Sequence, residues 1–162
     1  MKNLILVAVL LLVVASLSFA QPSSANASVS VTVNATLSIF KTNDLAFGTV
    51  SRGTSATVLS TDAAAAAFTI TGVESASTGI VVTPPATLSN GTSTLPFIAA
   101  IPVSNTTNTQ VGATALAATT GGSATTNAVG NLWLWIGGGV NVGIAQQSGN
   151  YSGTMTVSVT QP

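Results

Sequence analysis

Residues 28–39 read SVSVTVNATLSI, and throughout this stretch Val, Ala, Leu or Ile alternates with Ser, Thr or Asn. Successive side chains of a β-strand point to opposite faces of its sheet, so this alternation is typical of a strand with one buried face. The same alternation returns at residues 151–160 (YSGTMTVSVT). These two stretches predict a chain that is built from β-strands.

Between them, short runs of β-branched and aromatic residues are bounded by Gly, Pro, Asn or Asp, which favours further strands. The predicted strands are residues 45–50, 56–59, 65–72, 79–83, 94–104, 132–136 and 140–144. We expect a turn at residues 41–44 and loops at residues 105–110 and 119–127, which are rich in Thr, Gly and Asn. Short strands with frequent turns and no helical pattern predict an all-β fold, an antiparallel immunoglobulin-like β-sandwich.

The first twenty residues have the features of a secretory signal peptide. Lys2 precedes an apolar run at residues 4–15, and the small residues Ser18 and Ala20 stand where a signal peptidase requires them. Cleavage would leave a flexible segment at residues 21–28 and a single sandwich domain at residues 29–162. We therefore expect a secreted protein, located between the periplasm and the cell surface or outside the cell, with no transmembrane segment after cleavage.

Charged residues make up only 4% of the chain, and it contains neither His nor Cys. The missing His and Cys exclude the usual zinc sites, a thiol nucleophile, a disulfide and an imidazole base. So few cations cannot neutralise a row of phosphates, which excludes nucleic acid as a partner. The acids Asp44, Asp62 and Glu74 are too scattered for paired catalytic carboxylates or a calcium site, and Lys41 and Arg52 are expected to be solvated ion-pair partners near Asp44. We expect no enzyme, no metal and no cofactor.

The first alternating stretch is a candidate subunit contact. Its apolar positions are Val29, Val31, Val33, Ala35 and Leu37. They could form a donor strand, which adds to the sheet of a neighbouring subunit through main-chain hydrogen bonds and side chains in pockets. They could equally form an ordinary first strand that pairs inside its own domain.

A second candidate lies in the predicted strand 132–136, where Trp133 and Trp135 share one face. Indoles at this spacing could fill the sandwich core, form a subunit contact, or stack on sugar rings as a glycan platform. The three alternatives remain open at the level of the sequence.

Structural roles are expected for Tyr151, Gly48 and Gly72. The stretch 149–153 (GNYSG) resembles a tyrosine corner, in which the phenol bonds back to nearby backbone. Gly48 interrupts the predicted strand 45–50, and Gly72 ends the predicted strand 65–72.

Four short motifs occur in order along the chain: DLAFG (44–48), FTITG (68–72), LWIGG (134–138) and QSGNYSG (147–153). This set resembles a family of secreted bacterial β-sandwich proteins of formally unknown function, which is similar to spore coat protein U and to chaperone–usher pilin domains. The resemblance implies an immunoglobulin-like sandwich at the cell surface or in a fibre, with a periplasmic chaperone and an outer-membrane usher as partners. It implies no catalytic residues. The chain departs from such pilins because it has no Cys and lacks an aromatic residue near its end.

The expected function is therefore structural. We expect an exported, fimbria-like subunit of a surface fibre, coat or matrix, which self-associates into a polymer by strand addition or face-to-face packing. The alternative is a secreted carbohydrate-binding or adhesive module that binds glycans with the face of Trp133 and Trp135.

Overall fold

The computed structural model describes Ser28, residues 30–31 and residues 36–162, and this part of the chain contains strands and no helix. The strands are β1 (Ser38–Asn43), β2 (Thr54–Val58), β3 (Ala66–Thr71), β4 (Ser77–Thr83), β5 (Thr87–Ser89), β6 (Thr94–Ala99), β7 (Val103–Asn105), β8 (Thr114–Ala115), β9 (Gly121–Thr125), β10 (Asn131–Ile136), β11 (Gly138–Val142) and β12 (Thr156–Thr160). The predicted signal peptide, residues 1–20, lies outside the described residues.

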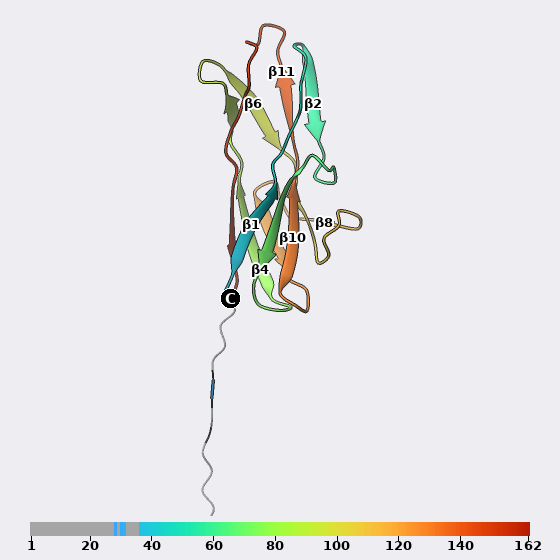
Figure 1. The fold of residues 1–162 in the computed structure, drawn as a ribbon, viewed down its shortest axis with the longest axis vertical. Helices are drawn as coiled ribbons and strands as arrows, with labels where there is room; N and C mark the ends of the chain where they lie inside the picture. The colour runs from blue at the N-terminus through green and yellow to red at the C-terminus, as the bar shows by residue number, and fades with distance from the viewer. Residues whose placement is uncertain (1–27, 29, 32–35) are drawn as a thin grey trace, which may run out of the picture. The chain divides into compact units, whose positions relative to one another are not determined.

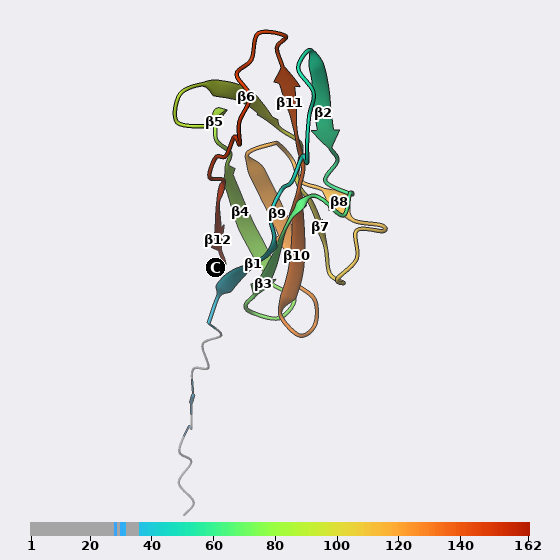
Figure 2. The same cartoon turned by 45° about the horizontal axis from the view of Figure 1, so that its top comes forward.

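The strands form three antiparallel sheets. A five-stranded sheet has the order β1-β3-β10-β7-β8, a four-stranded sheet the order β2-β11-β6-β5, and a three-stranded sheet the order β12-β4-β9. Figures 1 and 2 show β2, β6 and β11 in one half of the domain and β1, β4 and β10 in the other. The all-β sandwich predicted from the alternating pattern is confirmed.

The main core lies where the five-stranded and three-stranded sheets face each other. The alternate residues of each strand that point into this layer are aliphatic, because burying apolar area is the main favourable term in folding. The buried members are Ala66, Ile70, Ile80, Val82, Leu116, Leu132, Leu134 and Ile136. This half of the domain is therefore closed by a sheet on each side.

The five-stranded and four-stranded sheets share three long strands that are interrupted at one level. Gly137 separates β10 from β11, residues 59–65 separate β3 from β2, and residues 100–102 separate β6 from β7. Ser60 joins all three interruptions. Its buried Oγ donates a hydrogen bond to the Ile101 carbonyl oxygen at 2.8 Å and accepts one from the Gly137 amide at 2.9 Å.

Ser60→Ala should lower the free energy of unfolding by about 1–3 kcal/mol, because it leaves the buried Gly137 amide without an acceptor. The measurement is urea denaturation followed by tryptophan fluorescence. Ser55→Ala is the matched control, since Ser55 lies exposed on β2 in the same sheet. Equal losses in the two variants would contradict the role of Ser60 as a brace.

The three-stranded sheet is fastened at its end by Gln161. The Gln161 Oε1 accepts a hydrogen bond from the Val73 amide at 2.8 Å, and its Nε2 donates to the Thr78 Oγ1 at 2.8 Å. Thr78 is 0% exposed, so Gln161 supplies a partner to a hydroxyl that water cannot reach.

Four predictions about individual strands were wrong. Residues 45–50 contain no strand, and β1 extends to Asn43 where a turn was predicted. Residues 94–104 divide into β6 and β7 because the chain passes between two sheets at residues 100–102. The predicted loop 119–127 contains β9, where Gly121 (φ +115°) lets the backbone approach the Ile80 carbonyl of β4 more closely than any side chain would allow.

The opening stretch also differs from its prediction. The strand begins only at Ser38, which pairs with Thr71 at the end of β3, so the ladder has no further partner residue on β3. The earlier residues that the structure describes carry no strand. They are Ser28, Ser30, Val31 and residues 36–37.

Candidate functional site

The four-stranded sheet has an apolar inner face that no second sheet of the described part of the chain covers. The buried residues of this face are Leu95, Phe97, Val140 and Val142. Two segments outside the strands lie over it instead: residues 44–50, which lead from β1 to β2, and residues 147–155, which lead into β12 (Figure 2). Phe47 of the first segment packs edge-to-face on Phe97, with ring centroids 6.2 Å apart. One half of the sandwich is therefore closed by single segments of chain.

Between these two segments lie two neighbouring cavities of about 530 Å³ and 380 Å³. Both are lined by Phe47, Gly48, Leu88 and Tyr151, so they form one depression, which we call the inter-segment groove. One wall is residues 44–50 and the other is residues 147–155; the remaining lining residues include Lys41, Arg52, Ala66, Phe68, Pro85, Leu95, Phe97, Val140 and Val142. The groove has an apolar floor and a polar rim.

Most backbone groups of the groove walls have no partner within the described part of the chain. In the 44–50 wall, the Ala46 amide donates to the Ala64 carbonyl at 3.1 Å, and no other backbone hydrogen bond joins this wall to a described residue. In the opposite wall, Ser152 exchanges two hydrogen bonds with Ser89 of β5, at 2.8 and 3.0 Å. Free N–H and C=O groups along an edge are a template for pairing with another strand.

The 44–50 wall has the side-chain pattern of a strand without the pairing. Leu45 and Phe47 are half-buried and pack on the core, while Ala46 and Gly48, which alternate with them, are exposed. Gly48 has φ +65°, and a Cβ built on it would meet nothing within 4 Å, so this position faces open space. The sequence therefore identified which side chains point inward but missed the groove beside them.

Tyr151 holds the opposite wall in place. Its hydroxyl donates to the Gln147 carbonyl oxygen at 2.8 Å and accepts from the Gln146 Nε2 at 2.8 Å. Gln146 also donates to the Thr94 carbonyl oxygen at 3.0 Å. The phenol thus bonds back to nearby backbone, as in a tyrosine corner, and ties the loop before β12 to β6.

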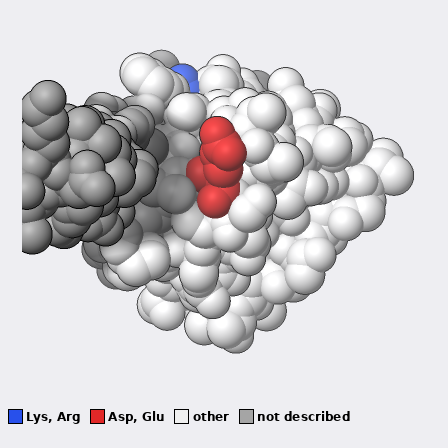
Figure 3. Space-filling view, turned by 90° about the horizontal axis from the view of Figure 1, so that it is seen from below, with Lys and Arg blue, Asp and Glu red and all other residues white. Residues whose placement is uncertain are grey.

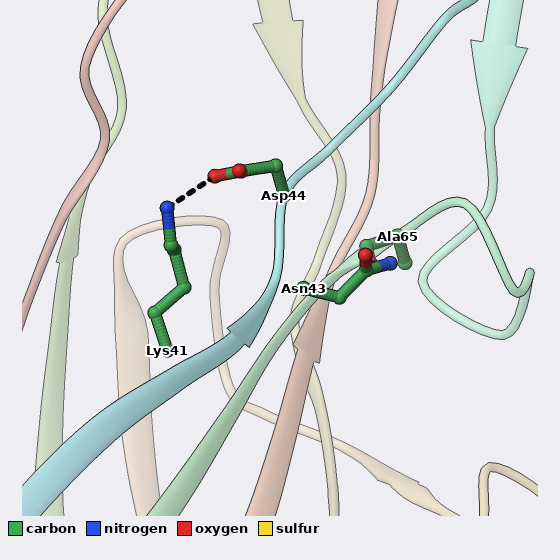
Figure 4. Close-up of polar contacts among 4 residues, drawn as sticks. All are labelled: Lys41, Asn43, Asp44 and Ala65. Carbon is green, nitrogen blue, oxygen red and sulfur yellow. Dashed lines mark hydrogen bonds and ion pairs between the residues drawn. The ribbon is translucent and has the colours of Figure 1, made fainter.

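Charged side chains lie at the rim of the groove. Lys41 and Asp44 form an ion pair at 2.6 Å, and beside it the Asn43 Nδ2 donates to the Ala65 carbonyl oxygen at 2.9 Å (Figure 4). Because the Lys41 and Asp44 side chains are 55% and 78% exposed, their pair adds little to stability. Figure 3 shows how little charge the surface carries: one view has a small acidic patch and one small basic spot at its upper edge, and the rest of the described surface in that view is uncharged.

The two tryptophans do not form a pair of exposed indoles. Trp135 is only 6% exposed and packs with Val58, Ala65 and Val103, and Trp133 is half-buried at the edge of the same cluster. The outer face of the sheet is covered here because Gln110 donates to the carbonyl oxygens of Ser60 and Asp62, at 3.2 and 2.8 Å. The burial of Trp135 agrees with the first of the three alternatives, a place in the core, whereas a subunit contact and a glycan platform stay predictions.

The candidate donor residues are divided between two environments. Val31 is 83% exposed, whereas Leu37 is half-buried and packs on the main core. A Cβ on Gly72 would contact the side chains of Leu37 and Gln161, so a larger residue there would require these two side chains to move. Val29, Val33 and Ala35 lie outside the described residues.

The described residues contain neither a cluster of metal-ligating side chains nor a membrane-spanning helix. In residues 28, 30–31 and 36–162, no group of three or more His, Cys, Asp or Glu side chains could hold a metal ion. The same residues contain no helix that is long and apolar enough to cross a membrane.

Comparison with known proteins gave one match. A family model with the description "domain of unknown function (DUF4402)" matches residues 13–160. No curated protein and no solved structure matched the chain.

Proposed function

Since the chain belongs to the DUF4402 family, a domain family of unknown function, its function must be argued from its own residues, and we propose that it is an exported structural subunit of a surface fibre, coat or matrix. The observation that carries this proposal is that single segments of chain, and not a second sheet, cover one half of the sandwich. Two segments with largely unpaired backbones cover the apolar face of the four-stranded sheet, and the inter-segment groove lies between them. A second copy that added a strand there would complete the missing layer.

The low charge supports self-association. No charged residue follows Glu74 in the sequence, so strand edges such as that of β12 carry none of the Lys side chains that usually prevent edge-to-edge pairing. A surface with net charge near zero also has little long-range repulsion between copies. Export is supported by the signal-peptide features of residues 1–20. The similarity to spore coat protein U and pilin domains, and with it a chaperone and an usher as partners, forms part of the proposal.

Negative-stain microscopy and size-exclusion chromatography of the mature protein test the proposal. We expect regular filaments, or assemblies much larger than one chain. A protein that stays monomeric at every concentration would overturn it.

Folding and assembly should change little between about pH 5 and 9. With no His and no Cys, the sequence has none of the side chains whose ordinary pKa values lie between about 6 and 9. The midpoint of thermal unfolding should therefore move by less than about 4 °C, which is roughly 1 kcal/mol for a chain of this size. Thermal melts and sedimentation across this range provide the measurement, and a larger shift would show that an acid group is coupled to folding or assembly.

A further inference from the structure

We propose that the inter-segment groove accepts residues 28–36 of a second copy of this chain as an added β-strand. The inference rests on the proposed function, and it names the surface and the segment through which the copies would join.

The walls of the groove suit an inserted strand. In the 44–50 wall only the Ala46 amide forms a backbone hydrogen bond to a described residue, and in the 147–155 wall residues 153–155 form none to a described residue. A strand in the groove would pair with a wall wherever its backbone comes within the roughly 4.7–4.9 Å that separates neighbouring strands. Gly48 leaves room for a backbone to approach the first wall, since a Cβ built on it would meet nothing within 4 Å. Gly153 in the other wall is instead packed against the side chains of Leu88 and Pro85.

The floor of the groove suits alternating apolar side chains. Leu88, Leu95 and Phe97 lie beneath the walls. A strand of about five residues spans roughly 17 Å and presents every second side chain to one face. An occupant with apolar residues at alternate positions would therefore bury them against the floor and leave its polar residues in water.

Residues 28–36 have this pattern. Val29, Val31 and Val33 alternate with Ser and Thr, and the segment carries no charge. Val31, on the apolar face of this pattern, is 83% exposed. An occupant with this pattern would place its valines on the apolar floor of the groove and its Ser and Thr side chains in water.

Residues 28–36 of a second copy can reach the groove more easily than the same residues of the chain that forms it. The groove begins at Lys41 and Asp44, at the end of β1, whereas Leu37 packs on the main core just before β1 begins at Ser38. To reach its own groove, the segment before Leu37 would have to reverse direction immediately and run back beside β1. Insertion into a neighbour instead joins a different surface on each copy, and such head-to-tail contacts generate closed rings or, where the rotation does not close, open filaments.

Paired aspartate substitutions test the occupant. Val31→Asp places a charge on the apolar face of the segment, and Ser30→Asp places the same charge on its polar face. Burying a charge without a partner is very unfavourable, so Val31→Asp should raise the concentration needed for assembly about tenfold or more. Ser30→Asp should leave that concentration within about threefold of the wild type, because its charge stays in water. Equal effects of the two substitutions would overturn the proposal.

Cysteine cross-linking tests the location of the contact. The chain has no Cys, so a disulfide between two single-cysteine variants can form only between copies. Ser30→Cys should cross-link to Thr49→Cys or Thr154→Cys, one in each groove wall, when the variants are mixed and oxidised. Thr125→Cys, exposed on β9, should remain uncross-linked because paired Cα atoms must lie within about 7 Å.

The two proposals can fail separately. Wild-type assemblies that resist Val31→Asp, or that cross-link to Thr125→Cys and not to the groove walls, would overturn this inference and leave the structural-subunit function standing. A wild-type protein that never assembles would overturn both.

Discussion

Gly137→Ala is expected to unfold the domain, or to lower its free energy of unfolding by more than about 4 kcal/mol. A Cβ at this position would contact the Val58 carbonyl oxygen and would lie 2.6 Å from the Ser60 amide nitrogen and 2.7 Å from the Leu59 carbonyl carbon. All three are backbone atoms, so no side-chain rotation can make room. The long strands must then separate where Ser60 joins them, and urea denaturation measures the cost.

Gly139→Ala is the matched control, two residues further along the same pair of strands. Its Cβ would lie 3.6 Å from the Ala56 carbonyl oxygen and 3.6 Å from the Thr57 Oγ1, which are ordinary contacts. We expect a change within about 1 kcal/mol, because replacing Gly with Ala at an uncrowded position mainly reduces the freedom of the unfolded chain. Similar losses in the two variants would mean that crowding at Gly137 is not the cause.

Trp135→Ala should cost about 3–5 kcal/mol, since it removes a large buried side chain and leaves a cavity beside Val58, Ala65 and Val103. Trp133→Ala should cost clearly less, because Trp133 lies half-buried at the edge of that cluster. Thermal and urea unfolding of both variants measure the difference. A larger loss for Trp133→Ala would show that the cluster is centred elsewhere.

The sequence predicted best the strands that have a neighbouring strand on each side in their sheet. The predicted ranges 65–72, 79–83 and 132–136 match β3, β4 and β10 closely, because their apolar residues pack in the core whichever neighbour they pair with. The pattern failed where pairing, and not burial, decides the outcome. Residues 45–50 alternate correctly, and Leu45 and Phe47 point inward, yet no strand among the described residues pairs with this segment.

The groove was out of reach of sequence reasoning for the same reason. Its walls are about a hundred residues apart in the chain, and its floor comes from β5, β6 and β11. No periodicity within one stretch shows which edges stay unpaired after folding. The tyrosine corner was accessible because it is local: the Tyr151 hydroxyl reaches a carbonyl only four residues away.

The position of β12 has a consequence for the order in which the domain can fold. β12 pairs with β4, and Gln161 reaches Thr78 across 83 positions of sequence. The three-stranded sheet, and the closed half of the core beneath it, therefore stay incomplete until nearly the whole chain is present. Contacts this distant in sequence form slowly. A chain that emerges N-terminus first, from a ribosome or across a membrane, would therefore remain incompletely folded for most of its passage. The three-stranded sheet would form only when β12 has emerged and can pair with β4.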